Sequence, residues 1–294
     1  MTRLLALIAC WGGCAGSVPD PATATASAEL ATGVERAGLV AEVERSDWSQ
    51  AFRETGAVGT FVLRDLETGR TQRLDPARAA ERMLPASTFK IYNALVALET
   101  GVVSDPDSLF AWDGVERFLP TWNQDQSLRD GLRNSTVWVY QRVARRVGRD
   151  RYRQSFAAEL YGNSEIGPDV GLFWLDQSLR ISADEQVRFV ERLVRGRLAF
   201  RPGVQETVRG MVPVLVDTLG TRVLGKTGWG EREGEPDLGW IVGWVEGAGG
   251  TAVFALNAEA DGPGSAFSFA DRLAIARAIL ETEGRLAGGA GGRP

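Results

Sequence analysis

The order of strand and helix patterns along this chain restricts the folds that it can adopt. Residues 58–66 alternate polar and apolar side chains, a turn signal follows at 67–69, and residues 70–74 suit a return strand. Three further segments near the C-terminus have strand character: 222–227, 238–245 and 251–257. Strands from the two ends of a chain share one sheet when the segment between them folds outside that sheet.

The segment between these strands has the periodicity of helices. A helix follows Pro85, and helical patterns occupy residues 135–147, 150–160 and 184–196. A last helix is predicted from about 269 to 283, with these residues on its apolar face: Leu273, Ile275, Ala276, Ile279 and Leu280. We therefore predict an α+β fold, with an antiparallel sheet flanked by terminal helices, an inserted helical lobe, and the active site in the cleft between them.

The N-terminal residues 1–14 have the composition of an export signal. Arg3 supplies a positive charge, and residues 4–9 form an apolar run. The sequence L-I-A-C at 7–10 resembles the bacterial lipoprotein cleavage box, which would place a lipid on Cys10, and ordinary secretory cleavage is the alternative. We expect an exported, periplasmic protein that is either soluble or anchored by lipid at Cys10.

Composition divides the rest of the chain. Residues 15–38 are rich in Ala, Thr, Ser, Pro and Gly, and are predicted to form a flexible linker. One catalytic domain is predicted at 39–284, and the Gly-rich residues 285–294 are predicted to be a loose tail. The net charge is −5, with acidic and basic residues mixed along the chain, so no nucleic acid is expected as a partner.

Two residue types are scarce enough to exclude whole classes of chemistry. The chain has no His, which rules out a Ser-His-Asp triad, a Cys-His protease and a His-ligated zinc hydrolase. The two Cys residues, at 10 and 14, lie in the predicted signal, so the mature domain offers no thiol nucleophile and no Cys-ligated metal. We expect no metal, and a catalytic base must then be Lys, Asp, Glu or Tyr.

The chain has 33 Lys and Arg residues, and Lys90 and Lys226 are its two lysines. Arg cannot release its proton near neutral pH, whereas a desolvated Lys can. The two lysines are therefore candidates for functions that Arg cannot perform. The alternative is that they survived by chance in a genome that favours Arg.

The segment from Pro85 to Lys90 places a hydroxyl and an amine together at the start of a helix. Ser87 and Lys90 are three residues apart, on the same helical face. Free N–H groups at a helix start can also hold a developing oxyanion. The alternative is a helix-capping Ser followed by a surface Lys.

Two more short motifs carry candidate site residues. Ser135 opens an apolar helical pattern, where it could pass a proton to a leaving group; helix capping is the alternative. Lys226, Thr227 and Gly228 lie at the end of a predicted strand, where the amine and the hydroxyl suit a carboxylate and Gly228 permits close approach of a ligand. The alternative is an ordinary strand that ends in a turn.

In combination, S-x-x-K and K-T-G resemble the motifs of the penicillin-recognising serine enzymes. Within that group the chain resembles the class D β-lactamases, the oxacillinase type, over about residues 45–283. The resemblance rests on these segments: S-T-F-K at 87–90, S-T-V at 135–137, Y-G-N at 161–163, F-W-L at 173–175, L-R-I-S at 179–182, and the strands at 239–245 and 254–257.

The resemblance implies how a β-lactam, the expected small-molecule partner, would be hydrolysed. Ser87 would form the acyl-enzyme, and the N–H groups of Ser87 and Trp229 would form the oxyanion hole. Lys90, neutral in an apolar pocket, would take up carbon dioxide as a carbamate and act as general base, with no other cofactor. Ser135 would relay a proton to the leaving nitrogen.

The resemblance also implies which residues surround the substrate. Val137 and Trp174 would wall the pocket, while Lys226, Thr227 and Arg272 would hold the substrate carboxylate. The family has an arginine on its last helix. Counting from the strand at 254–257 without a gap places that arginine at Phe269, whereas allowing for three inserted residues places it at Arg272. K-T-G is followed here by Trp229 instead of the commoner Phe, which is expected to reshape the pocket rim.

Two rival functions use the same motifs. The sensor domains of β-lactam receptors resemble class D enzymes and acylate with little turnover. These receptors have several membrane helices before the sensor, which this sequence lacks, so we expect the hydrolase. A cell-wall transpeptidase or carboxypeptidase is the second rival.

Overall fold

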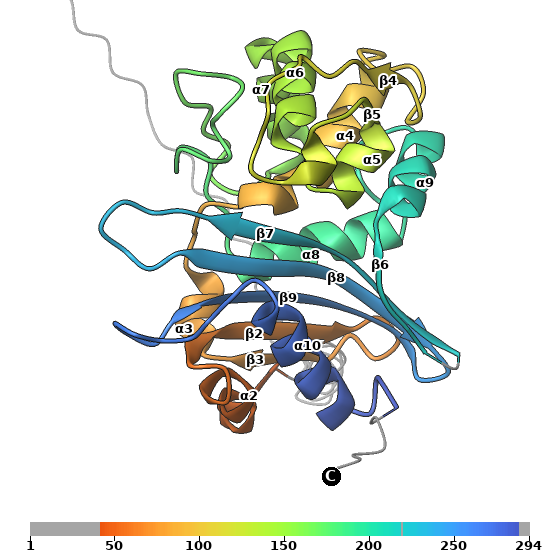
Figure 1. Cartoon of the computed structure of the whole chain (residues 1–294). Coiled ribbons are helices and arrows are strands. Elements are labelled where there is room, and N and C mark those ends of the chain that lie inside the picture. The colour runs from red at the N-terminus through yellow and green to blue at the C-terminus, as the bar shows by residue number, and fades with distance from the viewer. Residues whose placement is uncertain (1–41, 219, 288–294) are drawn as a thin grey trace, which may run out of the picture. The chain divides into compact units, whose positions relative to one another are not determined.

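The computed structural model describes residues 42–218 and 220–287. A seven-stranded sheet runs through the centre of this part of the chain (Figure 1). Its strands, from one edge to the other, are β1 (Glu42–Glu44), β3 (Thr71–Leu74), β2 (Ala57–Asp65), β9 (Gly250–Ala260), β8 (Leu238–Gly247), β7 (Thr221–Gly230) and β6 (Val214–Thr218). The α+β prediction is confirmed. The sheet is antiparallel except between β1 and β3, where the three-residue β1 is too short to leave a pattern in the sequence.

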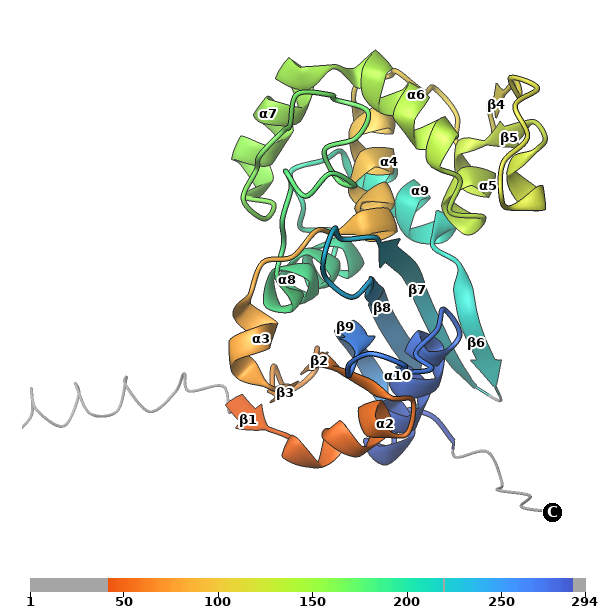
Figure 2. The same ribbon diagram turned by 60° about the vertical axis from the view of Figure 1, so that its left-hand side comes forward.

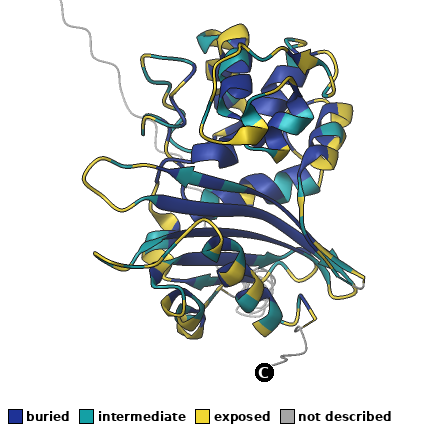
Figure 3. Cartoon of the chain, in the orientation of Figure 1, coloured by how far each residue is buried: buried dark blue, intermediate teal, exposed yellow. Residues whose placement is uncertain are grey.

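The central strands come from both ends of the chain, as the sequence predicts. β2 pairs with β9 over nine residues, which joins the N-terminal and C-terminal strands. In β8, residues 238–245 are all buried, because helices cover both faces of the sheet at this position (Figure 3). A strand buried on both faces is apolar along its length instead of alternating.

One face of the sheet packs against α10 (Asp271–Thr282) and α2 (Ser49–Arg53). The apolar face predicted for the last helix is confirmed by Ile275, Ala276, Ile279 and Leu280, which are buried against Phe61 and other sheet residues. The opposite face packs against α8 (Ala183–Val194) and α3 (Pro76–Ala80). Figure 2 shows α8 and α10 on opposite sides of the sheet.

The helical lobe lies beyond α8 and β7 (Figures 1 and 2). Its centre is α4 (Lys90–Glu99), preceded by the 3-10 helix η2 (Ala86–Phe89), and residues 90–98 are all buried. The other members are α5 (Leu128–Arg133), α6 (Val137–Val147), α7 (Arg149–Glu159), α9 (Pro202–Met211), the short strands β4 (Leu109–Phe110) and β5 (Gln126–Ser127), and the 3-10 helix η3 (Pro120–Trp122). A further 3-10 turn, η1 (Ser46–Trp48), leads into α2.

The ends of the predicted domain can be compared with the structure only in part. The predicted signal at 1–14 and linker at 15–38 lie outside the described residues. Arg285 and Leu286, which the sequence assigns to the loose tail, contact the folded domain: Leu286 is 5% exposed and Arg285 hydrogen-bonds Asp65 and the Gly249 carbonyl. No helix between 42 and 287 is long and apolar enough to cross a membrane.

Candidate active site

The turn from η2 into α4 brings the Ser87 hydroxyl and the Lys90 amine together. Lys90 Nζ lies 2.6 Å from Ser87 Oγ, and the Lys90 side chain is fully buried. Ser87 lies inside η2, whose N-cap position is occupied by Pro85, so the helix-capping alternative for Ser87 is wrong. The alternative that Lys90 lies on the surface is also wrong, because its side chain is buried. Ala86, just before Ser87, has a φ of 48°, a left-handed conformation that stores on the order of 1–3 kcal/mol for a residue with a side chain.

The surroundings of Lys90 favour the neutral amine. Burial holds the pKa of Lys90 well below its usual value of 10.5, and the positive charge of Lys226 lowers it further. Apolar surroundings disfavour the charged form because they cannot replace its hydration. A lowered pKa increases the fraction of neutral amine at a given pH, and only the neutral amine can accept a proton, as an activating base must.

Trp174 lies in the aromatic layer beside the residue that precedes Lys90. Its ring stacks on Phe89, with the centroids 5.4 Å apart, and its side chain is fully buried. The indole Nε1 has no hydrogen-bond partner among the described residues. A buried donor without an acceptor costs about 1–3 kcal/mol, so a site for an acceptor is expected next to it. Val137, the other predicted wall residue, begins α6 and is partly buried.

Ser135 is held against the lysine of the K-T-G motif. Lys226 Nζ lies 2.9 Å from Ser135 Oγ and donates a second hydrogen bond to the Thr227 carbonyl at 2.8 Å. Ser135 has a φ of 58°, and the helix after it begins from Thr136, so Ser135 does not cap α6. Burial and the charge of Arg272 lower the pKa of Lys226 to about 7.

The motif K-T-G lies within β7 and ends two residues before the last residue of the strand, Gly230, and not at the strand end as the sequence suggests. A Cβ atom at Gly228 would come within 3.2 Å of the Pro85 carbonyl and of the Thr88 methyl group. Gly228 therefore lets β7 approach η2. This approach brings the segments that contain the N–H groups of Ser87 and Trp229 side by side.

Of the two positions considered for the family's arginine, 269 and 272, the structure joins the one that holds an arginine, Arg272, to the K-T-G motif. The guanidinium of Arg272 donates to the Gly228 carbonyl, and its Nε donates to the Phe269 carbonyl at 2.9 Å. The side chain is 7% exposed, and burial lowers the pKa of Arg272 to about 10. A charge kept this close to Lys226 gives the site an excess of positive charge, which suits an anionic group.

Comparisons with known proteins agree with this geometry. The chain matches the penicillin binding protein transpeptidase domain over residues 55–281. β-Lactamase OXA-2 of Salmonella typhimurium is 42% identical to it, over 82% of this chain and 85% of that protein. The solved structure of the class D β-lactamase YbXI from Nostoc is 36% identical, with a TM-score of 0.76, and the match covers 81% of this chain and 99% of that one.

This chain belongs to the class D β-lactamases. A receptor domain has the same fold: the C-terminal domain of the Bacillus licheniformis BlaR penicillin-receptor is 33% identical, with a TM-score of 0.76, over 83% of this chain and 98% of that one.

In this class D protein, aromatic side chains form the rim next to Arg272. The Trp229 ring lies 4.2 Å from the ring of Phe269 and 5.5 Å from that of Phe267, centroid to centroid. The Arg272 guanidinium lies 5.3 Å from the rings of Trp229 and Phe269. Trp229 also donates from Nε1 to Asp237 at 2.9 Å. The sequence analysis missed Phe267, Phe269 and Asp237 as rim residues, because only the fold brings them to Trp229.

Another residue that the class D motifs do not include is Gln186, which is fully buried and hydrogen-bonds Thr88 of the S-T-F-K segment. A sequence signal for it exists, because Gln186 is a polar residue on the apolar face of the predicted helix at 184–196. Between residues 42 and 287, leaving aside 219, no group of three or more potential metal ligands is found.

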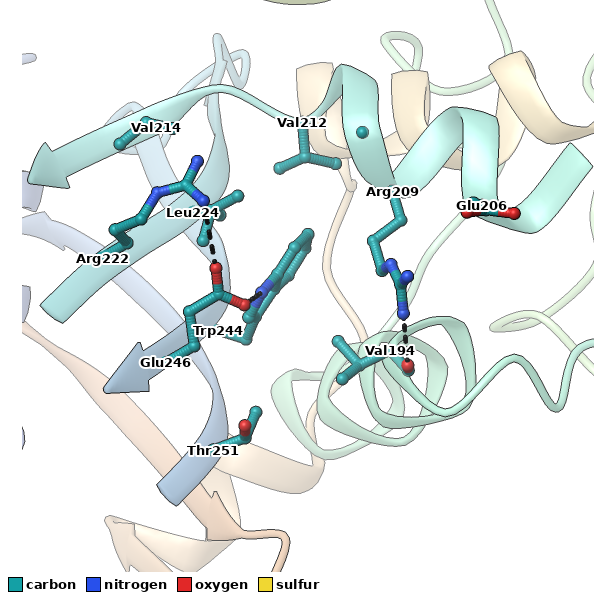
Figure 4. A pocket seen from close by; sticks show the side chains of 11 residues that line it. Val194, Glu206, Arg209, Val212, Val214, Arg222, Leu224, Trp244, Glu246 and Thr251 are labelled. Carbon is teal, nitrogen blue, oxygen red and sulfur yellow. Dashed lines mark hydrogen bonds and ion pairs between the residues drawn. The ribbon is translucent and has the colours of Figure 1, made fainter. Parts of the chain in front are cut away.

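A pocket of about 660 Å³ lies at the other end of β7, away from the predicted site residues (Figure 4). Arg222 and Glu246 pair on one side of it, and Arg209 reaches the Val194 carbonyl on the other. None of the predicted site residues lines this pocket, so it is separate from the candidate active site.

Proposed function

We propose that this chain hydrolyses β-lactam antibiotics through a covalent acyl-enzyme on Ser87. The observation that carries the proposal is the 2.6 Å separation between Lys90 Nζ and Ser87 Oγ in a buried site. Burial lowers the pKa of Lys90, so a proton acceptor lies next to the hydroxyl. The relatives that are named β-lactamases support the same reaction.

In the acylation step, Ser87 Oγ attacks the lactam carbonyl carbon and its proton passes to the base at Lys90. The N–H groups of Ser87 and Trp229 would stabilise the negative charge on the carbonyl oxygen. The carbon–nitrogen bond then breaks, and the lactam nitrogen takes a proton from Ser135. Lys226, 2.9 Å from Ser135 Oγ, would replace that proton.

Deacylation requires a base that activates a water molecule. Carbon dioxide added to the neutral Lys90 amine gives a carboxylated lysine, which would supply an anionic general base. The unpaired Nε1–H of Trp174 fits such a group, because it could donate to one of the carboxylate oxygens. Val137 would add an apolar wall that limits hydration. Water then attacks the ester carbonyl, and Ser87 regains its proton as the product leaves.

The positive charges on and beside β7 would hold the substrate carboxylate. Lys226 and Arg272 are both buried, and the Thr227 hydroxyl belongs to the same strand. A planar guanidinium can bind a carboxylate with two parallel hydrogen bonds. Gly228 keeps this strand close to the acylated serine.

The test is turnover of a chromogenic cephalosporin by the purified full chain, followed by intact-mass spectrometry after exposure to a penicillin. We expect many turnovers per molecule for the wild type, and no acyl adduct on Ser87→Ala. Ser46→Ala, a change at an exposed serine of η1, should behave like the wild type. An acyl adduct on Ser87→Ala would remove Ser87 as the nucleophile.

The same experiment separates the rival functions. A single equivalent of released chromophore with a stable adduct would indicate a sensor-type binding module, the role suggested by the fold of the BlaR receptor domain. Hydrolysis or transfer of cell-wall peptides, with no sustained turnover of the cephalosporin, would indicate a transpeptidase or carboxypeptidase.

Export to the periplasm is a separate part of the proposal and rests on the composition of residues 1–14 alone. Expression of the full chain in bacteria, with a radiolabelled fatty acid, tests whether Cys10 is lipidated. Label on the wild type and none on Cys10→Ser would support a lipid anchor. Cleavage without label would support ordinary secretion, and an uncleaved cytoplasmic chain would contradict export.

A further inference from the structure

The strained turn before Ser87 is held by hydrogen bonds to one carbonyl group. The backbone N–H of Thr88 donates to the Pro85 carbonyl at 3.2 Å, and the Thr88 hydroxyl donates to the same oxygen at 2.7 Å. Between them lies Ala86, with its left-handed φ of 48°. A left-handed residue with a side chain persists only where its surroundings hold it in place, and Thr88 supplies two of these restraints.

Thr88 is itself held from another element. Gln186 Nε2, on α8, donates to Thr88 Oγ1 at 2.8 Å, and both side chains are fully buried. Because the Thr88 hydroxyl gives its proton to Pro85, its lone pairs are free to accept from Gln186. The direction of these hydrogen bonds is therefore fixed: the Gln186 amide donates to the Thr88 hydroxyl, and the Thr88 hydroxyl donates to the Pro85 carbonyl.

A buried tyrosine, Tyr161, lies close to the Gln186 amide. The Tyr161 hydroxyl lies beside Gln186, and both the hydroxyl and Gln186 Oε1 are buried with no hydrogen-bond partner among the described residues.

The Pro85 carbonyl, which accepts the last of these hydrogen bonds, lies against the K-T-G strand. Pro85 O would be 3.2 Å from a Cβ atom at Gly228, and Trp240 on β8 donates to the neighbouring Leu84 carbonyl at 2.9 Å. Thus the position of the Pro85–Ser87 turn relative to β7 determines the distance between the N–H groups of Ser87 and Trp229. Hydrogen-bond donors stabilise an oxyanion only when they are aimed at its position.

We propose that Gln186 is a positioning residue, which acts through Thr88 to hold the turn before Ser87 and so sets the geometry of the oxyanion hole. The inference rests on the proposed acylation of Ser87 but does not require hydrolysis, since a sensor that only acylates would use the same hole. The Gln186 side chain hydrogen-bonds Thr88 and not Ser87 or Lys90, so we expect it to affect the chemistry through this turn.

The test compares Gln186→Met, which keeps the length of the side chain without its hydrogen bonds, with Thr88→Val, which removes the other partner. We expect the acylation rate constant to fall on the order of 10- to 100-fold in both, while the initial binding constant of the substrate changes little. The infrared band of the acyl-enzyme ester carbonyl, marked with carbon-13, should move to higher wavenumber because the oxyanion hole then donates weaker hydrogen bonds to the carbonyl oxygen. The pH profile of acylation should keep its shape, because neither change touches Lys90.

Gln205→Met is the matched control. Gln205 is 3% exposed on α9 and donates to the carbonyls of Leu198 and Phe200, so its loss should lower the melting temperature without moving the carbonyl band. Thr88→Ser, which retains the hydroxyl, should restore most of the acylation rate. In the double variant Gln186→Met with Thr88→Val, the acylation rate constant should fall little further than in either single variant, because both changes break the same series of hydrogen bonds.

The proposal is overturned if the carbonyl band and the acylation rate constant of Gln186→Met match those of the wild type. It is also overturned if the losses of acylation rate in Gln186→Met and Thr88→Val add fully in the double variant. Should Gln186→Met not fold, Thr88→Val and Thr88→Ser give the same test from the other end of the hydrogen bond. Absence of any acyl adduct on the wild-type chain would instead contradict the proposed function, so the two failures are distinguishable.

Discussion

The Lys226 amine lies 2.9 Å from the hydroxyl of Ser135, and both groups come from segments that are 91 residues apart. Lys226 also lies close enough to Lys90 for its charge to lower the pKa of that amine. The two lysines of the chain are therefore coupled through one buried site. Protonation of one of them disfavours protonation of the other, so Lys226 helps to keep Lys90 neutral.

Binding of β-lactams that have a carboxylate should weaken as the pH rises above about 7. Burial lowers the pKa of Lys226 to about 7, so its positive charge is present below this pH and is lost above it. We expect KM to rise between pH 7 and 9 for the wild type and to stay flatter for Lys226→Arg, in which the charge persists. Equal pH profiles of KM for the two proteins would argue against a charged Lys226 in substrate binding.

Protein stability should depend on pH through the same group. An unfolded Lys keeps its proton up to its ordinary pKa of 10.5, while folded Lys226 releases it near 7. Between these values the unfolded state binds more protons, so the free energy of unfolding should increase with pH. In Lys226→Met the increase should be smaller. Urea denaturation at pH 7 and 9 measures the difference, and an unchanged slope would show that Lys226 titrates normally.

Turnover should depend on bicarbonate if Lys90 is carboxylated. Degassed enzyme at mildly acidic pH should slow, and added bicarbonate should restore the rate. Trp174→Phe keeps the stacking on Phe89 but removes the unpaired Nε1–H, and Trp174→Ala removes both, so both variants should need more bicarbonate. The carbon-13 NMR signal of a carbamate, formed from labelled bicarbonate, gives a readout apart from activity. Identical rates and no carbamate signal at any bicarbonate concentration would disprove carboxylation.

Arg272→Ala should raise KM for penicillins while the protein stays folded. The loss should be on the order of 1.5–3 kcal/mol, as for a hydrogen bond to a charged group. Arg277→Ala on the same helix is the control, because Arg277 is exposed and pairs only loosely with Glu281, at 3.8 Å. If Arg277→Ala raises KM and Arg272→Ala does not, the assignment of the carboxylate-binding arginine is wrong.

Gly228→Ala should slow acylation more than it lowers stability. The new methyl group would meet the Pro85 carbonyl and the Thr88 methyl at 3.2 Å, which forces η2 and β7 apart by a few tenths of an ångström. Gly210→Ala on α9, where a Cβ meets nothing within 4 Å, should instead stabilise the protein by about 0.5–1 kcal/mol. Stopped-flow acylation and thermal denaturation measure the two effects, and normal acylation by Gly228→Ala would contradict the close packing.

The local sequence determined most of the secondary structure. The predicted strands and helices, including the helix that opens after Pro85, are present to within a few residues, because each has a clear apolar period or a turn signal at its ends. Elements with a weaker signal were missed, among them α9 and the three-residue β1, since a short segment is stabilised by its neighbours more than by its own sequence.

The sequence by itself also narrowed the chemistry expected of this site. The absence of His leaves Lys, Asp, Glu or Tyr as a catalytic base, and the S-x-x-K and K-T-G motifs, which resemble those of the penicillin-recognising serine enzymes, favour a serine–lysine site. Tertiary structure alone decided which arginine approaches K-T-G, that Phe267 and Phe269 join Trp229 at the rim, and that Gln186 holds Thr88. These contacts join residues 38 to 98 positions apart, so they depend on how α8, α10 and β7 pack and not on any local pattern.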